Sequence, residues 1–172
     1  MTTSRVARLV MLLVLAAPLA ALAEDTQIPM RQKKTATFYV PVQLGSSFSG
    51  EFLVDTGSSH MAIRESTLRD LQEQGHARFV KNLAGRMADG SRKVVPVYRI
   101  DQVRIGKNCL IEGVEAAVFP DSARPILGLS ALRQAAPVRF SMNPPTLQLS
   151  RCGGRTAATG GSGAVAQAES RE

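Results

Sequence analysis

The chain has 172 residues, 44% of them hydrophobic, and its 21 Lys and Arg against 14 Asp and Glu give a formal net charge of +7. This length is typical of one domain with a proper core, and no run of basic residues with interleaved aromatics indicates nucleic-acid binding. Its 2 His and 2 Cys show no zinc-ligand spacing and no Gly-rich phosphate loop opens a helix, so we expect no metal, no cofactor and no nucleic acid.

Residues 1–23 have the layout of a bacterial secretory signal peptide. Two Arg precede an uncharged apolar run over residues 9–22, and Ala-Leu-Ala at residues 21–23 matches a signal-peptidase site. The run is shorter than the roughly 20 residues needed to cross a bilayer, and Pro18 interrupts it. We expect cleavage after Ala23 and a periplasmic or secreted product, with no stable membrane span unless the signal is retained as an anchor.

The rest of the chain divides by composition into three parts. Residues 24–36 are polar and predict a flexible N-terminal segment. Residues 37–152 hold the patterned strands and predict the folded domain. Residues 153–172 are Gly, Ala, Ser and Thr with a few charges and no periodicity, which is typical of a disordered C-terminal tail.

The first half of the domain predicts a hairpin, a short strand and a helix. Apolar residues alternate over residues 38–44, and Pro41 favours an edge position for that strand. A turn over residues 45–50 leads to a returning strand over residues 51–54. Residues 60–63 predict another short strand. Residues 65–74 predict a helix in which Leu68 and Leu71 share a face, and Gly75 suits the position just beyond its end.

The second half is rich in short strands separated by turn signals. A hairpin is predicted from residues 79–85 and 93–100, with an Asp-Gly dipeptide at its tip. Residues 101–106 and 114–119 predict two more strands, and residues 130–133 a short helix. A final hairpin is predicted over residues 138–142 and 146–149. This pattern predicts an all-β fold, a small closed or partly closed barrel with one or two short helices.

One stretch combines a strand with an acid and a turn. The apolar residues 52–54 run directly into Asp55, and Thr56, Gly57 and Ser58 follow. A carboxylate beside a buried strand is costly unless something pairs with it or uses it. Taken alone, the tripeptide is more often the end of a strand in an Asx or Ser/Thr turn.

Three motifs in one order make the stretch specific. The apolar strand ending in Asp-Thr-Gly-Ser is followed about 35 residues later by an Ala-Asp-Gly hairpin tip, and an apolar-apolar-Gly triplet then precedes a short helix and a final strand pair. This order, over roughly Thr37 to Ser150, resembles the retropepsin-like aspartic proteases, specifically single-domain bacterial members with a signal peptide. The resemblance implies an acid-protease barrel that acts as a homodimer.

The resemblance implies a role for each residue of the motif. Asp55 matches the catalytic aspartate. Thr56 matches the threonine whose hydroxyl interlocks with its symmetry mate beneath the site. Gly57 matches the glycine that lets the substrate backbone approach closely. Ser58 lies where a hydroxyl can hydrogen-bond the outer oxygen of the aspartate, and such a bond would shift activity toward acid.

The other two motifs match the flap and a structural element of the family. The hairpin tip matches the flap that closes over bound peptide: Ala88, Asp89 and Gly90. The triplet matches the segment that packs beside the active-site loop: Ile126, Leu127 and Gly128. His60 follows where the family varies, and we expect it to face solvent because a pH-sensitive role needs a positioned partner.

Hydrolysis by this route needs two carboxylates that share one proton, one acting as base and the other as acid. The sequence holds one Asp-Thr-Gly, and Asp121-Ser122-Ala123 lacks the glycine and reads as a turn. The second carboxylate therefore has to come from a second copy of the chain, which predicts a twofold homodimer.

The two cysteines, Cys109 and Cys152, can form one disulfide in an oxidising compartment. The sequence leaves open whether they pair within a chain, between chains or not at all.

The sequence therefore predicts an aspartic endopeptidase that cleaves a protein or peptide substrate, namely exported or membrane proteins. The alternative is a noncatalytic peptide-binding module of the same fold in the cell envelope. A third hypothesis is a structural envelope protein that uses its positive charge to bind anionic surfaces.

Overall fold

A computed structural model describes residues 25–33, 36–46, 48–86 and 90–153. The predicted signal peptide and nearly all of the predicted tail lie outside these ranges. The described elements, in chain order, are β1 (Thr26–Pro29), β2 (Arg31–Lys33), β3 (Thr37–Leu44), β4 (Phe48–Val54), β5 (Met61–Arg64), α1 (Glu65–Glu73), β6 (Ala77–Arg86), β7 (Arg92–Ile105), β8 (Cys109–Phe119), β9 (Ile126–Leu127), α2 (Leu129–Leu132), β10 (Val138–Met142) and β11 (Pro145–Leu149).

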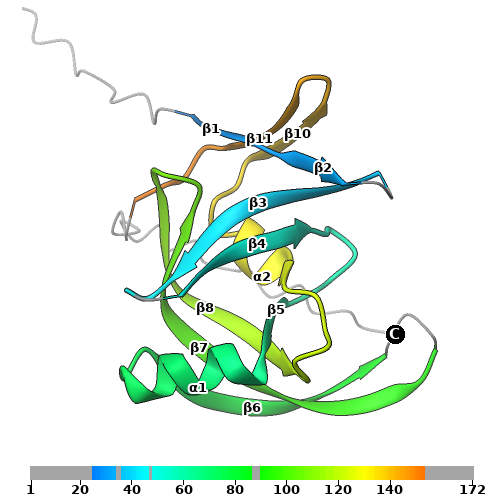
Figure 1. Cartoon of the computed structure of the whole chain (residues 1–172), viewed down its shortest axis with the longest axis vertical. Helices are drawn as coiled ribbons and strands as arrows, with labels where there is room; N and C mark the ends of the chain where they lie inside the picture. The colour runs from blue at the N-terminus through cyan, green and yellow to red at the C-terminus, as the bar shows by residue number, and fades with distance from the viewer. Residues whose placement is uncertain (1–24, 34–35, 47, 87–89, 154–172) are drawn as a thin grey trace, which may run out of the picture.

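The larger sheet closes on itself, which confirms the predicted small barrel. Its strands follow the order β2-β3-β4-β9-β5-β8-β7-β6, and an additional pairing of β3 with β7 joins the two sides. A second sheet of order β1-β11-β10 packs at one end (Figure 1). Closure leaves β6 outside the ring, where it pairs only with β7 in the described chain.

The prediction that β3 is an edge strand is wrong. Along β3, β2 pairs with Thr37 to Tyr39, β7 pairs with Val42 to Leu44, and β4 pairs along the opposite side. Pro41 lies between the end of the β2 pairing and the start of the β7 pairing. A residue without an N–H suits that gap, because no ladder hydrogen bond is required of it there.

The segment 24–36, which we expected to be flexible, contains two strands instead. β1 pairs with β11 along its full length, and β2 pairs with the start of β3. Ile28 and Met30 are buried in the main core. Their burial against a strand near the other end of the domain outweighs the polar composition of the segment, so the folded domain begins before residue 37.

The two helices lie where the sequence predicts them. Leu68 and Leu71 of α1 are buried, and Gly75 adopts a positive φ of 74° just beyond the helix. Helix α2 is a single short turn after β9. The predicted final hairpin is present as β10 and β11, and a disulfide joins Cys109 at the start of β8 to Cys152 after β11.

The hairpin of β6 and β7 reaches away from the barrel (Figure 1). Its strands pair from Ala77 with Ile100 out to Arg86 with Arg92. We expected residues 93–100 and 101–106 to be separate strands, but β7 continues through both, because its inner end is needed to close the barrel against β3 and β8. Residues 88 and 89 of the predicted tip lie outside the described residues.

Apolar side chains gather in two clusters on opposite faces of the sheet. The main core fills the barrel and includes Phe52, Met61 and Leu127. A smaller cluster lies on the other face of β6, β7 and β8 and consists of Val95, Val97 and Ala117, with Leu83 and Phe119 packed against them.

Candidate active site

Asp55 follows β4 at the point where the strand gives way to a turn. Leu53 and Val54 pair in parallel with Ile126 and Leu127 of β9, and the Asp55 N–H donates to the Leu127 carbonyl at 3.2 Å. The turn then folds back on the carboxylate, since the Gly57 N–H donates to Asp55 Oδ1 at 2.9 Å. One carboxylate oxygen is thereby oriented by the backbone, and the half-buried side chain remains accessible.

Gly128 packs directly against the backbone of the loop that follows Asp55. The Leu129 N–H donates to the Ser58 carbonyl at 2.9 Å. A Cβ at Gly128 would lie 2.2 Å from the His60 carbonyl oxygen and 2.8 Å from that of Ser58, so no side chain fits there. The structure thus places the apolar-apolar-Gly triplet directly beside the Asp55 turn.

The structure gives the Ser58 hydroxyl a different partner from the expected one. Its Oγ donates to the His60 carbonyl at 2.8 Å, within the same loop. A hydroxyl has one proton to donate, so this bond is made in place of one to the Asp55 carboxylate. The expectation of an acidic activity optimum rested on the Asp55 bond, and it loses that support.

Ser130 supports the loop from a position that the sequence did not single out. Its hydroxyl accepts the Met61 N–H at 2.8 Å and donates to the Glu115 carbonyl at 2.6 Å. These bonds tie the start of α2 to β5 and β8. A serine in a short helix carries no sequence signal for such a role, because its partners are 69 and 15 residues away.

His60 does not simply face solvent as we expected. Its side chain is about 20% exposed, and Nε2 lies 3.8 Å from Glu115 Oε2. Glu115 also binds Lys81 at 2.9 Å and lies 3.7 Å from Arg99. The hydrogen bond from Lys81 lowers the pKa of Glu115, and the positive charges of Lys81, His60 and Arg99 act in the same direction. Partial burial of the carboxylate opposes this shift.

Asp121, the only alternative carboxylate considered from the sequence, has a structural partner. Its Oδ1 accepts the Ser66 N–H at 2.9 Å at the start of α1, and this bond lowers the pKa of Asp121. That placement fits an acceptor at a helix N-terminus. Thr56 and Gly57 are exposed beside Asp55. The chain therefore presents one Asp-Thr-Gly turn with an open side.

One face of the sheet leads from Asp55 to the hairpin of β6 and β7. Cross-strand partners share a face, and so do alternate residues of one strand. Leu53 lies on the face of Asp55, two residues before it. The registers then continue this face across the sheet through Leu53, Ile126, Ala62, Ala117 and Val97.

This face, which we call the Asp55 face, carries the smaller apolar cluster. Val97 continues to Val95 along β7, and Val95 pairs with Leu83 of β6. The sequence did not reveal these residues as site candidates. Strands that are apolar on both faces read as continuous runs, so the pattern alone does not say which side faces a ligand.

In the described ranges, no group of three or more His, Cys, Asp or Glu side chains is arranged to hold a metal ion. Of the flap residues named from the sequence, Gly90 is described and has a positive φ of 82°. Among the residues that the structure describes, no helix is long and apolar enough to cross a membrane.

Comparisons with known proteins agree with this geometry. Residues 40–134, more than half of the chain, match the family described as gag-polyprotein putative aspartyl protease. Among solved structures, 55 chains match. One is the crystal structure of a retropepsin-like aspartic protease from Rickettsia conorii, with a TM-score of 0.51 and 23% identity over 73% of this chain and 91% of that chain. At that identity the likeness shows the fold. No curated protein matches the chain.

Proposed function

This chain belongs to the gag-polyprotein putative aspartyl protease family, and we propose on that premise that it is an aspartic endopeptidase whose active site is built from the Asp55 residues of two chains. The family and the retropepsin-like fold support a peptidase in general. The observation that carries the finer proposal is the single Asp55 turn, which is fixed by its own backbone and by β9 but left open toward a partner.

In the proposed dimer, Asp55 and its mate face each other across the twofold axis. Two carboxylates a few ångströms apart share one proton, because both cannot ionise together. The ionised carboxylate takes a proton from water as the water oxygen bonds to the peptide carbonyl carbon, and the protonated carboxyl gives its proton to the carbonyl oxygen. Transfer of a proton to the amide nitrogen then allows the C–N bond to break, which releases an acid and an amine.

The Asp55 face gives the substrate a place to lie. An extended peptide can lie along this face. Its apolar side chains then contact Leu83 and Phe119, the partly exposed residues that pack against the buried cluster of Val95, Val97 and Ala117. The exposed Gly57 leaves the substrate backbone room to approach Asp55.

We also propose that the substrates are exported or membrane proteins and that the enzyme works in the periplasm or outside the cell. Support comes from the composition of residues 1–23 and from the disulfide between Cys109 and Cys152, which suits an oxidising compartment. Residues 24–152 then form the working domain.

Comparing wild type with Asp55→Asn tests the chemistry. Both proteins are incubated with a proteome-derived peptide library from about pH 4 to pH 7, the range in which carboxylate pairs change state. We expect cleavage by wild type and a loss of at least about 100-fold in the variant, since general acid–base catalysis contributes that much or more. Binding of the same peptides without cleavage by either protein would instead favour the noncatalytic peptide-binding module.

Mixing the two proteins tests the dimer. When equal amounts exchange subunits at random, only dimers with two wild-type chains keep both carboxylates, so activity should fall to about half of that of the unmixed wild type. An enzyme that works as a monomer would keep its full activity after mixing.

A further inference from the structure

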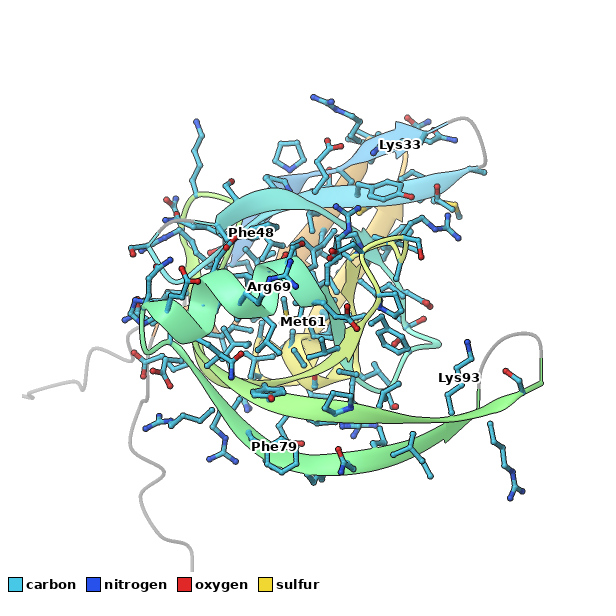
Figure 2. All side chains as sticks on the ribbon, turned by 60° about the horizontal axis from the view of Figure 1, so that its bottom comes forward. Lys33, Phe48, Met61, Arg69, Phe79 and Lys93 are labelled. Carbon is cyan, nitrogen blue, oxygen red and sulfur yellow. A yellow bond between two sulfur atoms is a disulfide. The ribbon has the colours of Figure 1, made fainter. Side chains whose placement is uncertain are left out.

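Lys93 lies at the outer end of the Asp55 face. Alternate residues of a strand share a face, so Lys93 lies on the side of Val95 and Val97, whereas Arg92 lies on the opposite side. The registers place Gly85 opposite Lys93 and Leu83 opposite Val95. Figure 2 shows the Lys93 side chain leaving the hairpin toward the side on which the barrel lies.

Nothing in the described chain neutralises this lysine. Lys93 is exposed and has no ion-pair partner among the described residues. Its cross-strand neighbour Gly85 has no side chain that could cover it. At the other end of the apolar cluster, by contrast, Lys81 is held by Glu115 at 2.9 Å. Among the described residues, this face therefore ends, beyond the partly exposed Leu83, in a positive charge that has no ion-pair partner.

We propose that Lys93 is a specificity-determining residue that selects substrates with an acidic side chain beside an apolar one. The proposal rests on the proposed peptidase function, in which the peptide lies along this face. In an extended peptide, residues two positions apart face the same way and are separated by about 6.6 Å, as Val95 and Lys93 are along β7. When an apolar side chain contacts Leu83, which lies opposite the buried Val95, an Asp or Glu two residues further along is therefore placed to pair with the Lys93 ammonium group.

The peptide backbone keeps its orientation whichever residue occupies this position. An acidic side chain gains the ion pair, a neutral one neither gains nor loses charge energy, and a basic one is repelled. Lys93 is exposed, so the gain is that of a solvent-exposed ion pair, which corresponds to a preference of about 2- to 5-fold for Glu over Gln.

Peptide binding measures this preference without requiring turnover. The protein is purified after expression of the full chain, with Asp55→Asn to prevent cleavage. Fluorescein-labelled decapeptides with an apolar residue at the centre carry Glu, Gln or Lys two positions away, on either side, and their dissociation constants are measured by fluorescence anisotropy. We expect the order Glu, Gln, Lys from tightest to weakest, with the Glu-to-Gln ratio shrinking at high salt.

Two charge reversals, at adjacent residues on opposite faces, locate the effect. Lys93→Glu should invert the order so that the Lys peptide binds most tightly, and Lys93→Gln should bring the Glu-to-Gln ratio to about 1. Arg92→Glu changes the net charge by the same amount and should leave the order intact. Equal binding of all peptides, or an inverted order in Arg92→Glu as well, would overturn the assignment of Lys93.

A separate measurement on the same proteins and peptides tests the proposed function. Cleavage of the Gln peptide by the chain with Asp55 intact reports on the peptidase, whatever the binding ratio. If that peptide is cut but the Glu peptide is neither bound nor cut better, only the inference about Lys93 fails. If no peptide is bound or cut, both fail.

Discussion

Replacing Gly128 with Ala should remove activity by moving the active-site turn. An added Cβ would lie 2.2 Å from the His60 carbonyl oxygen, 2.7 Å from the His60 carbonyl carbon and 2.8 Å from the Ser58 oxygen. These are backbone atoms, so no side-chain rotation relieves the overlap. Close C···O contacts in proteins lie near 3.3 Å, so the backbone at Gly128 and the loop that carries the Ser58 and His60 carbonyls must move apart by about 1 Å.

The size of the effect follows from that displacement. Overpacking of a tight site costs about 1–3 kcal/mol of the free energy of unfolding, and we expect the upper end because the backbone has to move. A displacement of about 1 Å at a catalytic group reduces the rate by roughly 100-fold. Gly128→Ala should therefore be less stable by about 3 kcal/mol and at least about 100-fold less active per folded molecule.

Gly75→Ala is the matched control. Gly75 has a φ of 74°, yet a Cβ there would meet no atom within 4 Å. The change carries the conformational cost of a left-handed residue, about 1–2 kcal/mol, with no overlap and no contact with the site. Stability is measured by urea unfolding and activity by peptide cleavage. Gly128→Ala with activity within about twofold of wild type would refute the steric argument.

Two further predictions concern the scaffold. Replacing Cys109 and Cys152 with Ser removes a disulfide with a sequence separation of 43 residues. In the chain-entropy model the free energy of unfolding should fall by about 4 kcal/mol, which urea unfolding measures. An unchanged urea midpoint would contradict this prediction. Glu115→Gln should make the free energy of unfolding less sensitive to acid. Because folding lowers the pKa of Glu115, its ionised carboxylate stabilises the fold above the ordinary pKa of 4.5, and this stabilisation is lost as the pH falls through the folded pKa. Between about pH 6 and pH 3 the variant should therefore lose less stability than wild type.

The barrel was predictable because its signals are local. The alternation over β3, the turn before β4 and the Asp-Gly tip between β6 and β7 are each set by residues within a few positions. The Asp55 motif and the triplet ending in Gly128 were readable for the same reason, because each is a short run next to an apolar strand.

What the sequence could not show depends on distant partners. β1 is polar by composition and becomes a strand only because β11 pairs with it. The Ser58 hydroxyl could bond several nearby acceptors, and only the path of the loop selects the His60 carbonyl. The role of Ser130 requires β5 and β8 to meet beside α2, which no local pattern encodes.

Because β1 pairs with β11, the domain cannot finish folding until its last strand has been synthesised. A chain made from its N-terminus displays Ile28 and Met30 early, but the strand that covers them is among the last parts of the domain to be made. Contacts between the two ends of a chain form late and slowly. The newly made chain therefore cannot complete its fold until residue 149 is available, and until then Ile28 and Met30 stay without the strand that pairs with β1.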